Sequence, residues 1–215
     1  MIWVNFCYIF QQPMPSVQSH PDKNVIRVQL KQNALLHELT DEQTSELESY
    51  LTIVDGHKGD FLLHQGVHDM EQYFILDGIL KRVVSNVDAK EMILRFAAER
   101  DVETSYAAWR LKKPAPYSIV CLTKARVAKM PLEQWVAFIE RNPSVKQAFE
   151  HHVMASMSDI MAHTITLHLL DATGRVQRFL RKQPELFDRI PKKELAAYLN
   201  LSAETLSRLK QRGKI

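Results

Sequence analysis

Three polar side chains near the end of the chain have the types and the spacing to read the edges of DNA bases. Glu204, Ser207 and Arg208 fall three and four positions apart in a predicted helix, so they share one face. A guanidinium can donate two hydrogen bonds to guanine, a carboxylate can accept one from cytosine, and a hydroxyl can contact thymine. The same residues also allow a simpler interpretation, an αα-hairpin with one ion pair between Glu204 and Arg208.

Two short helices joined by a tight turn must position this face. Pro191 suits the first position of a helix, where its missing N–H is not needed. Asn200 then suits the left-handed turn that ends this helix, and Ser202 suits the N-cap of the next one. Inward-facing apolar residues are expected at Leu195, Ala196, Leu199, Leu206 and Leu209. This pattern predicts a helix-turn-helix.

The local charge favours a phosphate-binding role for this segment. Residues 171–215 hold eleven Lys/Arg and five Asp/Glu, a net charge of +6, while the whole chain carries +3 and the remainder therefore −3. A basic module on a mildly acidic body is the electrostatic pattern of a DNA-binding protein. We expect the phosphate contacts to come from Lys192, Lys193, Lys210 and Arg212.

Composition limits the other possibilities. The chain of 215 residues has only two cysteines, which excludes a disulfide framework and suits a cytoplasmic protein. No apolar run reaches the length of a membrane span, and residues 1–10, although apolar, lack the features of a signal peptide. We expect residues 1–29 to form an arm and linker, with Met14 as an alternative start. No catalytic triad, phosphate-binding loop or metal-ligand motif is present, which indicates neither an enzyme nor a metal site.

The middle of the chain changes to short β-rich runs bounded by turn residues. A preceding helix is predicted over residues 30–51, with Thr40 as its N-cap and Gln43 completing a capping box. Strands are predicted at residues 51–55, 61–64, 73–76, 79–85, 92–97 and 118–130. Several short strands at this spacing indicate an antiparallel β-roll of the jelly-roll type, within a sensor domain of residues 30–142. Residues 101–112 predict a short helix inserted in the roll.

A long helix is predicted over residues 144–170, after a helix that Asn142 and Pro143 end. Apolar and small residues at alternating spacings of four and three form a seam of about three heptads, which predicts a homodimer through residues 143–170. The seam consists of Phe149, Val153, Ser156, Ile160, His163 and Leu167, followed by Leu170. A second apolar stripe lies beside it at Met154, Met157, Met161 and Ile165. The alternative is a helix buried within one domain.

The order of β-roll, long helix and helix-turn-helix resembles the CRP/FNR superfamily of bacterial transcription regulators. The resemblance covers roughly residues 35–215 and rests on five segments: residues 59–66, 73–81, 90–97, 169–180 and 203–208. It implies an α+β fold with a roll like that of cyclic-nucleotide-binding domains, a dimerisation helix, and a DNA-binding domain over residues 171–215. Glu204, Ser207 and Arg208 match the set that reads TTGA half-sites in the oxygen-responsive branch of the family.

The sequence departs from the pattern of that family in two places, at the residues that bind cyclic AMP and after the recognition helix. Glu103 matches the glutamate that holds the ribose, but Pro116 and Tyr117 stand where the phosphate-binding arginine belongs. We therefore expect cyclic AMP not to be the effector and no cofactor to be required. The candidate effector pocket consists of Arg95, Glu103, Tyr106, Trp109 and Tyr117. The sequence also resembles a wingless subgroup, because no β-hairpin follows the recognition helix.

Together these patterns predict a homodimeric regulator that binds an inverted repeat in double-stranded DNA, and RNA polymerase as a further partner. Two alternatives stay open. The chain could be a ligand-binding signalling module that does not bind DNA, or a constitutive regulator whose roll is empty.

Overall fold

The computed structural model describes residues 14–88 and 90–212, so the predicted apolar arm at residues 1–10 lies outside the described residues. Its helices are α1 (Lys23–Lys31), α2 (Asp41–Tyr50), α3 (Tyr106–Arg110), α4 (Leu132–Glu140), α5 (Pro143–Leu169), α6 (Ala172–Lys182), α7 (Pro184–Phe187), α8 (Lys192–Tyr198) and α9 (Ala203–Gln211). Its strands are β1 (Thr52–Gly56), β2 (Phe61–Leu63), β3 (Glu71–Asp77), β4 (Leu80–Ser85), β5 (Glu91–Ala97), β6 (Val102–Thr104), β7 (Ser118–Cys121) and β8 (Ala125–Pro131).

The strands form a roll of two antiparallel four-stranded sheets, with strand orders β1-β8-β3-β6 and β2-β7-β4-β5. Alternating residues of each strand point into the roll, where Phe74 and Ile119 are fully buried. The turn between β3 and β4 depends on Gly78, whose φ is +87° and whose absent Cβ would lie 2.2 Å from the carbonyl oxygen of Lys124. A side chain at this position would therefore strain the backbone and clash.

The N-terminal helices match one prediction and correct another. Thr40 caps α2 with a complete capping box, since its hydroxyl accepts from the Gln43 N–H at 3.2 Å and the Gln43 side chain accepts from Thr40 N–H at 2.9 Å. The predicted single helix over residues 30–51 is instead two helices. The linker predicted through residue 29 contains α1, because Ile26 and Leu30 lie one helical turn apart and bury one face.

Two further elements differ from the predicted ones. The run predicted as one strand over residues 118–130 is two strands, since residues 122–124 carry the chain from one sheet to the other without a glycine or proline. The helix predicted over residues 101–112 begins later, at Tyr106, because residues 102–104 pair with β3 as strand β6. This strand carries Glu103 into the interior of the roll, where it is 1% exposed.

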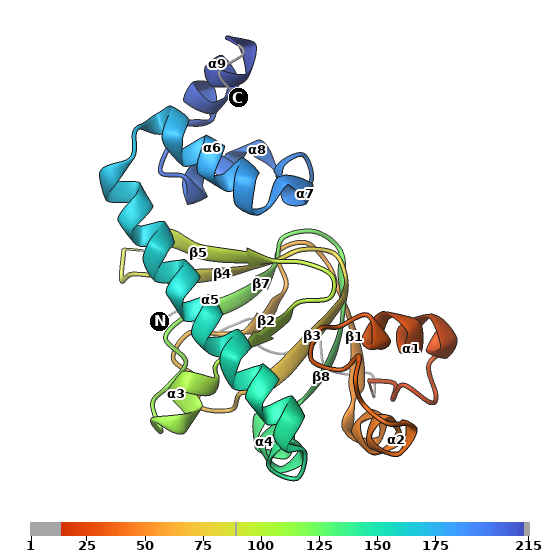
Figure 1. Cartoon of the computed structure of the whole chain (residues 1–215). Coiled ribbons are helices and arrows are strands. Elements are labelled where there is room, and N and C mark those ends of the chain that lie inside the picture. The colour runs from red at the N-terminus through yellow and green to blue at the C-terminus, as the bar shows by residue number, and fades with distance from the viewer. Residues whose placement is uncertain (1–13, 89, 213–215) are drawn as a thin grey trace, which may run out of the picture.

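Helices α4 and α5 follow the roll, and α5 runs obliquely across it to the C-terminal domain (Figure 1). Helix α4 buries Trp135, Phe138 and Ile139, while Val136 is half-buried. Pro143 begins α5, as its fixed φ predicts, and Asp171 caps α6 by accepting a 2.8 Å bond from the Gly174 N–H.

Helices α6–α9 form a C-terminal domain that packs on the outer face of the β2-β7-β4-β5 sheet (Figure 1). One hydrophobic cluster joins the two, with Phe96 of β5 against Tyr198 of α8 at 5.0 Å between ring centroids. Two ion pairs border it, Lys81–Glu194 at 2.9 Å and Arg189–Glu99 at 2.6 Å. A β-roll, a long helix and a terminal helical domain confirm the predicted fold class.

Candidate functional site

The turn between α8 and α9 has the local chemistry that the sequence predicts. Asn200 adopts φ +53°, and Ser202 accepts a 3.0 Å hydrogen bond from the Thr205 N–H, which satisfies a free donor at the start of α9. Leu206 is buried and Leu209 packs against the same cluster. Pro191 stands at the N-cap of α8, one position before the predicted one.

The outer face of α9 presents the three predicted base-reading residues. The side chains of Glu204 and Arg208 are 78% and 55% exposed, and Ser207 between them is half-buried. Arg208 Nε lies 3.9 Å from Glu204 Oε1, a loose exposed pair that contributes little to stability. Helix α9 lies on the side of its domain away from the roll (Figure 1). Both charged groups are therefore accessible to another molecule.

The four predicted phosphate-binding residues are exposed and border the same domain. Lys192 and Lys193 begin α8, while Lys210 and Arg212 lie at the end of α9. Lys210 Nζ is 3.4 Å from Asp188 Oδ1, a pair whose side chains are 57% and 85% exposed, so the ammonium group stays hydrated. All four cations belong to the basic part of the chain.

The face of α5 that was predicted as the dimer seam packs mainly within the chain. Phe149 is fully buried against Trp135, Ser156 Oγ accepts a 2.9 Å hydrogen bond from Arg95, and His163 stacks on Tyr198 with ring centroids 3.8 Å apart. The remaining seam residues, Val153, Ile160 and Leu167, are half-buried on the same side. The polar seam residues thus have partners inside the chain, and the seam assignment is corrected.

The second apolar stripe of α5 is the one that faces outward. The exposed fractions are 63% for Met154, 53% for Met157, 65% for Met161 and 51% for Ile165. Leu169 is 76% exposed at the end of the same helix. Contiguous exposed apolar side chains on one helix are typical of a surface that binds another protein.

A cavity of about 240 Å³ lies between the roll and α5, where an effector was predicted. Three of the five predicted pocket residues line it, namely Arg95, Tyr106 and Tyr117. Trp109 does not line the cavity but stacks on Tyr106 at 6.3 Å between ring centroids. Glu103 lies behind the wall and contacts the arginines that line it. Much of the remaining wall is apolar, with Leu94, Val102, Ala107, Ala108, Val153, Met157 and Ile160.

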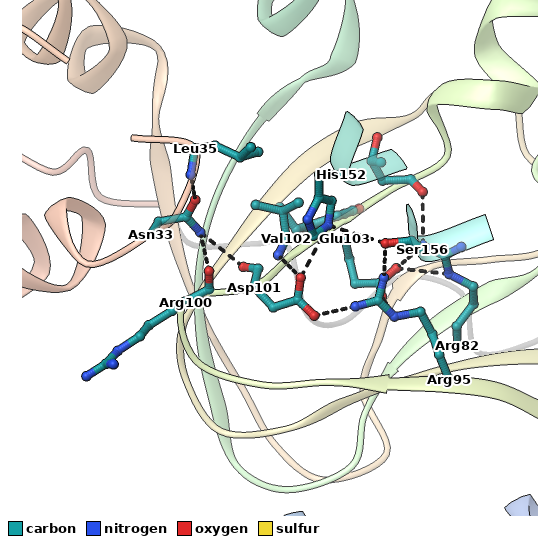
Figure 2. Close-up of polar contacts among 12 residues, drawn as sticks. Asn33, Leu35, Arg82, Arg95, Arg100, Asp101, Val102, Glu103, His152 and Ser156 are labelled. Carbon is teal, nitrogen blue, oxygen red and sulfur yellow. Dashed lines mark hydrogen bonds and ion pairs between the residues drawn. The ribbon is translucent and has the colours of Figure 1, made fainter. Parts of the chain in front are cut away.

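A buried charge cluster borders this cavity, and Figure 2 shows the polar contacts within it. The Glu103 carboxylate accepts a hydrogen bond from Arg82 Nε at 3.0 Å, and its other oxygen lies 3.2 Å from Arg95 Nε. Arg95 also pairs with Asp101 and donates to Ser156 of α5, while His152 Nε2 lies 3.3 Å from Asp101 Oδ1. The cluster thus connects β4, β5 and β6 to the long helix.

The protonation of this cluster follows from burial and from the neighbouring charges. Burial alone would lower the pKa of Arg95, but Glu103 and Asp101 raise it above its ordinary value, so the guanidinium stays charged. Burial lowers the pKa of His152, which favours the neutral imidazole. Burial also raises the pKa of Tyr117, whose ring lies 4.2 Å from the Arg82 guanidinium carbon. The guanidinium groups of Arg82 and Arg95 are therefore already paired with the buried carboxylate of Glu103.

Arg82, which is only 6% exposed, was not among the predicted pocket residues. The available signal was strand alternation, because Leu80 and Arg82 are two positions apart on β4 and share its inward face. A buried arginine requires a carboxylate nearby, and Glu103 supplies it. Arg110, seven positions after Glu103 in the sequence, is exposed at the end of α3 and does not line the cavity.

Across residues 14–88 and 90–212, no group of three or more His, Cys, Asp or Glu side chains could hold a metal ion. None of the helices in the described part of the chain combines the length and the hydropathy needed to cross a bilayer.

Parts of this chain are similar in sequence to known proteins. The cyclic nucleotide-binding domain family matches residues 54–142. The cAMP-activated global transcriptional regulator CRP of Salmonella typhimurium is 22% identical over 158 residues, 69% of this chain and 75% of that protein. The CRP of Pasteurella multocida is also 22% identical over 158 residues, 69% of this chain and 76% of its own length.

Two solved structures share the fold. FixK2 from Bradyrhizobium japonicum aligns with a TM-score of 0.64 at 17% identity, covering 76% of this chain and 86% of its own. The c-di-GMP responsive global regulator CLP of Xanthomonas campestris aligns with a TM-score of 0.65 at 16% identity, covering 81% and 93%. A match to the cyclic nucleotide-binding domain family, a long helix and a helix-turn-helix in this order support the resemblance to the CRP/FNR superfamily of regulators.

Proposed function

We propose that the protein is a homodimeric, sequence-specific DNA-binding transcription regulator. The observation that carries the proposal is the outer face of α9, where Glu204 and Arg208 are exposed on a capped helix in the most basic part of the chain. Two proteins similar to this chain, CRP and CLP, are themselves named as transcriptional or global regulators. RNA polymerase is the further partner that a regulator of this class requires.

We infer that the target is an inverted repeat with TTGA-like half-sites. Arg208 donates two hydrogen bonds to O6 and N7 of guanine, Glu204 accepts from N4 of cytosine, and Ser207 contacts thymine. Two such helices, one from each protomer, lie about 34 Å apart, which is one turn of B-DNA. Lys192, Lys193, Lys210 and Arg212 contact phosphates and supply most of the dependence on salt.

Dimerisation is assigned to the exposed stripe of α5. In a symmetric dimer this stripe meets its own copy, because the same surface of both protomers forms a twofold interface. Met154, Met157, Met161 and Ile165 then lose their contact with water, which supplies the driving force. The packed inner face keeps α5 attached to its own roll.

Substituting Arg208 with alanine is expected to cost about 1–3 kcal/mol per half-site and to relax the preference at one guanine. Substituting Lys193 with alanine is expected to weaken binding to matched and scrambled duplexes about equally, because a phosphate contact carries no sequence information. Competition binding on both duplexes at fixed salt measures the difference. If Arg208→Ala lowers affinity for both duplexes alike, then Arg208 contacts phosphate and the assigned face is wrong.

Cyclic AMP is expected not to bind in the roll. The two guanidinium groups that border the cavity are engaged by Glu103, so a cyclic phosphate would have to displace a buried carboxylate, at a cost of several kcal/mol. Calorimetry with cyclic AMP up to about 1 mM should show no saturable heat. Micromolar affinity would contradict this expectation and would assign the phosphate to Arg82 or Arg95.

A further inference from the structure

A second cavity, of about 280 Å³, lies where the roll, the long helix and the C-terminal domain meet. Its walls come from β5, from the second half of α5, and from α6 and α8. It adjoins the cavity in the roll, and Arg95, His152 and Ser156 border both. Because three parts of the chain contribute to it, its shape depends on how the C-terminal domain sits on the roll.

The charges around this cavity do not cancel. Arg95 is paired with Asp101 and Glu103, and Lys182 is paired with Asp159. Two further guanidinium groups, both from α6, have no carboxylate partner among the described residues.

These two arginines have different surroundings. Arg175 Nε donates to the carbonyl of Leu170 at 2.9 Å, and its Nη1 lies 3.2 Å from the carbonyls of Leu199 and Asn200, so it joins the end of α5 to the end of α8. Arg178 is half-buried and makes no hydrogen bond or ion pair with the part of the chain that the structure describes. A half-buried guanidinium without partners is costly, and an anion in the cavity would satisfy it.

Aromatic surfaces complete the site. Phe96, Phe179 and Tyr198 line the cavity, and His163 stacks on Tyr198 while its Nε2 lies 3.0 Å from the Tyr198 carbonyl oxygen. Burial lowers the pKa of His163 to about 4, so this imidazole is neutral at pH 7 and does not supply charge. Burial raises the pKa of Tyr198 to about 12, which keeps its hydroxyl a donor. Within the described residues this hydroxyl has no hydrogen-bond partner.

We propose that this cavity binds a small aromatic anion, a molecule with one ring and a phosphate or carboxylate group. The anionic group pairs with Arg178 and accepts from the Tyr198 hydroxyl, and the ring packs against the aromatic wall. A ligand held in this way contacts α6 and α8 as well as β5 and α5, so it fixes the C-terminal domain on the roll. A ligand that fixes this domain would also regulate DNA binding. That consequence rests on the proposed DNA-binding function, whereas binding of the anion to the cavity does not.

Calorimetry on the full chain tests the proposal with phenyl phosphate and benzoate as probes. Inorganic phosphate carries the charge without the ring, and phenol carries the ring without the charge. We expect saturable binding of at least one of the two aromatic anions, and weaker binding of both partial probes. If neither aromatic anion saturates the protein by about 10 mM, the cavity is not an anion site and the proposal is overturned.

Matched substitutions locate the site. Arg178→Gln is expected to weaken binding at least about tenfold, because it removes a charge-assisted hydrogen bond. Arg181→Gln is the control, because it removes the same charge from the same helix. Arg181 is exposed and does not line the cavity. Tyr198→Phe removes only the hydroxyl and keeps the ring that packs on His163. Thermal unfolding checks that each variant is folded.

Equal loss of affinity in the Arg178 and Arg181 variants would mean that the probe binds through general surface charge, which overturns the proposal. Unchanged affinity in the Arg178 variant would overturn it too. Adding the bound probe to a protein–DNA titration is a separate measurement. If the probe binds at Arg178 but no duplex is bound under any condition, the DNA-binding function fails while the anion site stands.

Discussion

Replacing both Met157 and Met161 with glutamate is expected to convert the dimer into monomers and to abolish tight binding to an inverted-repeat operator. The two methionines are 53% and 65% exposed and lie at the centre of the outward stripe of α5. A twofold interface would bury two carboxylates from each protomer without a counter-charge, which costs more than a single helix pair gains from apolar contact. Sedimentation equilibrium measures the first effect and operator binding the second.

A matched control uses exposed apolar residues outside the stripe. Val87 and Met92 are 101% and 54% exposed at the β4–β5 hairpin, so Val87→Glu with Met92→Glu adds the same charge elsewhere. This control should stay dimeric and bind the operator normally. A Met157/Met161 variant that sediments as a dimer would show that the interface lies on another surface.

Replacing Glu103 with glutamine is expected to lower the free energy of unfolding by about 3–5 kcal/mol, because it removes the charge that two buried guanidinium groups share. Glu103 is 1% exposed and contacts Arg82 at 3.0 Å and Arg95 at 3.2 Å. Without the negative charge, Arg82 keeps a neutral amide oxygen at position 103, a 3.3 Å hydrogen bond to the Thr104 carbonyl and the Tyr117 ring. Urea unfolding monitored by circular dichroism measures the loss.

Two control variants separate the loss of the buried charge from a general loss of stability on substitution. Glu133→Gln removes an exposed carboxylate from α4 and should change the stability by less than about 0.5–1 kcal/mol. The double variant Arg82→Met with Glu103→Leu removes a charge of each sign and should lose less stability than Glu103→Leu alone. A Glu103→Gln variant as stable as the parent chain would mean that water or another group compensates Arg82.

The elements that follow from local chemistry were predictable from the sequence. Ser202, Asn200 and the Thr40–Gln43 capping box act on backbone groups within four residues, so their sequence spacing is sufficient to place them. The exposed face of α9 follows from the positions of its apolar residues. The roles of Glu204, Ser207 and Arg208 toward DNA stay a prediction.

Which apolar stripe of α5 packs inward and which faces outward was not predictable from local spacing. Both stripes have helical spacing, and the choice between them depends on partners far away in sequence. Ser156 and His163 suggested a seam because their polar groups needed partners, but Arg95 and the backbone of Tyr198 supply them. Strand β6 was missed for a related reason, since three residues become a strand only by pairing with β3.

The hydrophobic cluster that joins the C-terminal domain to the roll makes any reorientation of that domain all-or-none. Phe96 and Ile93 of the roll are 1% and 5% exposed only because α6 and α8 cover the outer face of their sheet. A tilt of a few degrees would open gaps too small for water and lose contacts without gaining hydration. The domain is therefore stable either seated on the sheet or fully separated from it, and a signal has to supply the whole difference in free energy at once.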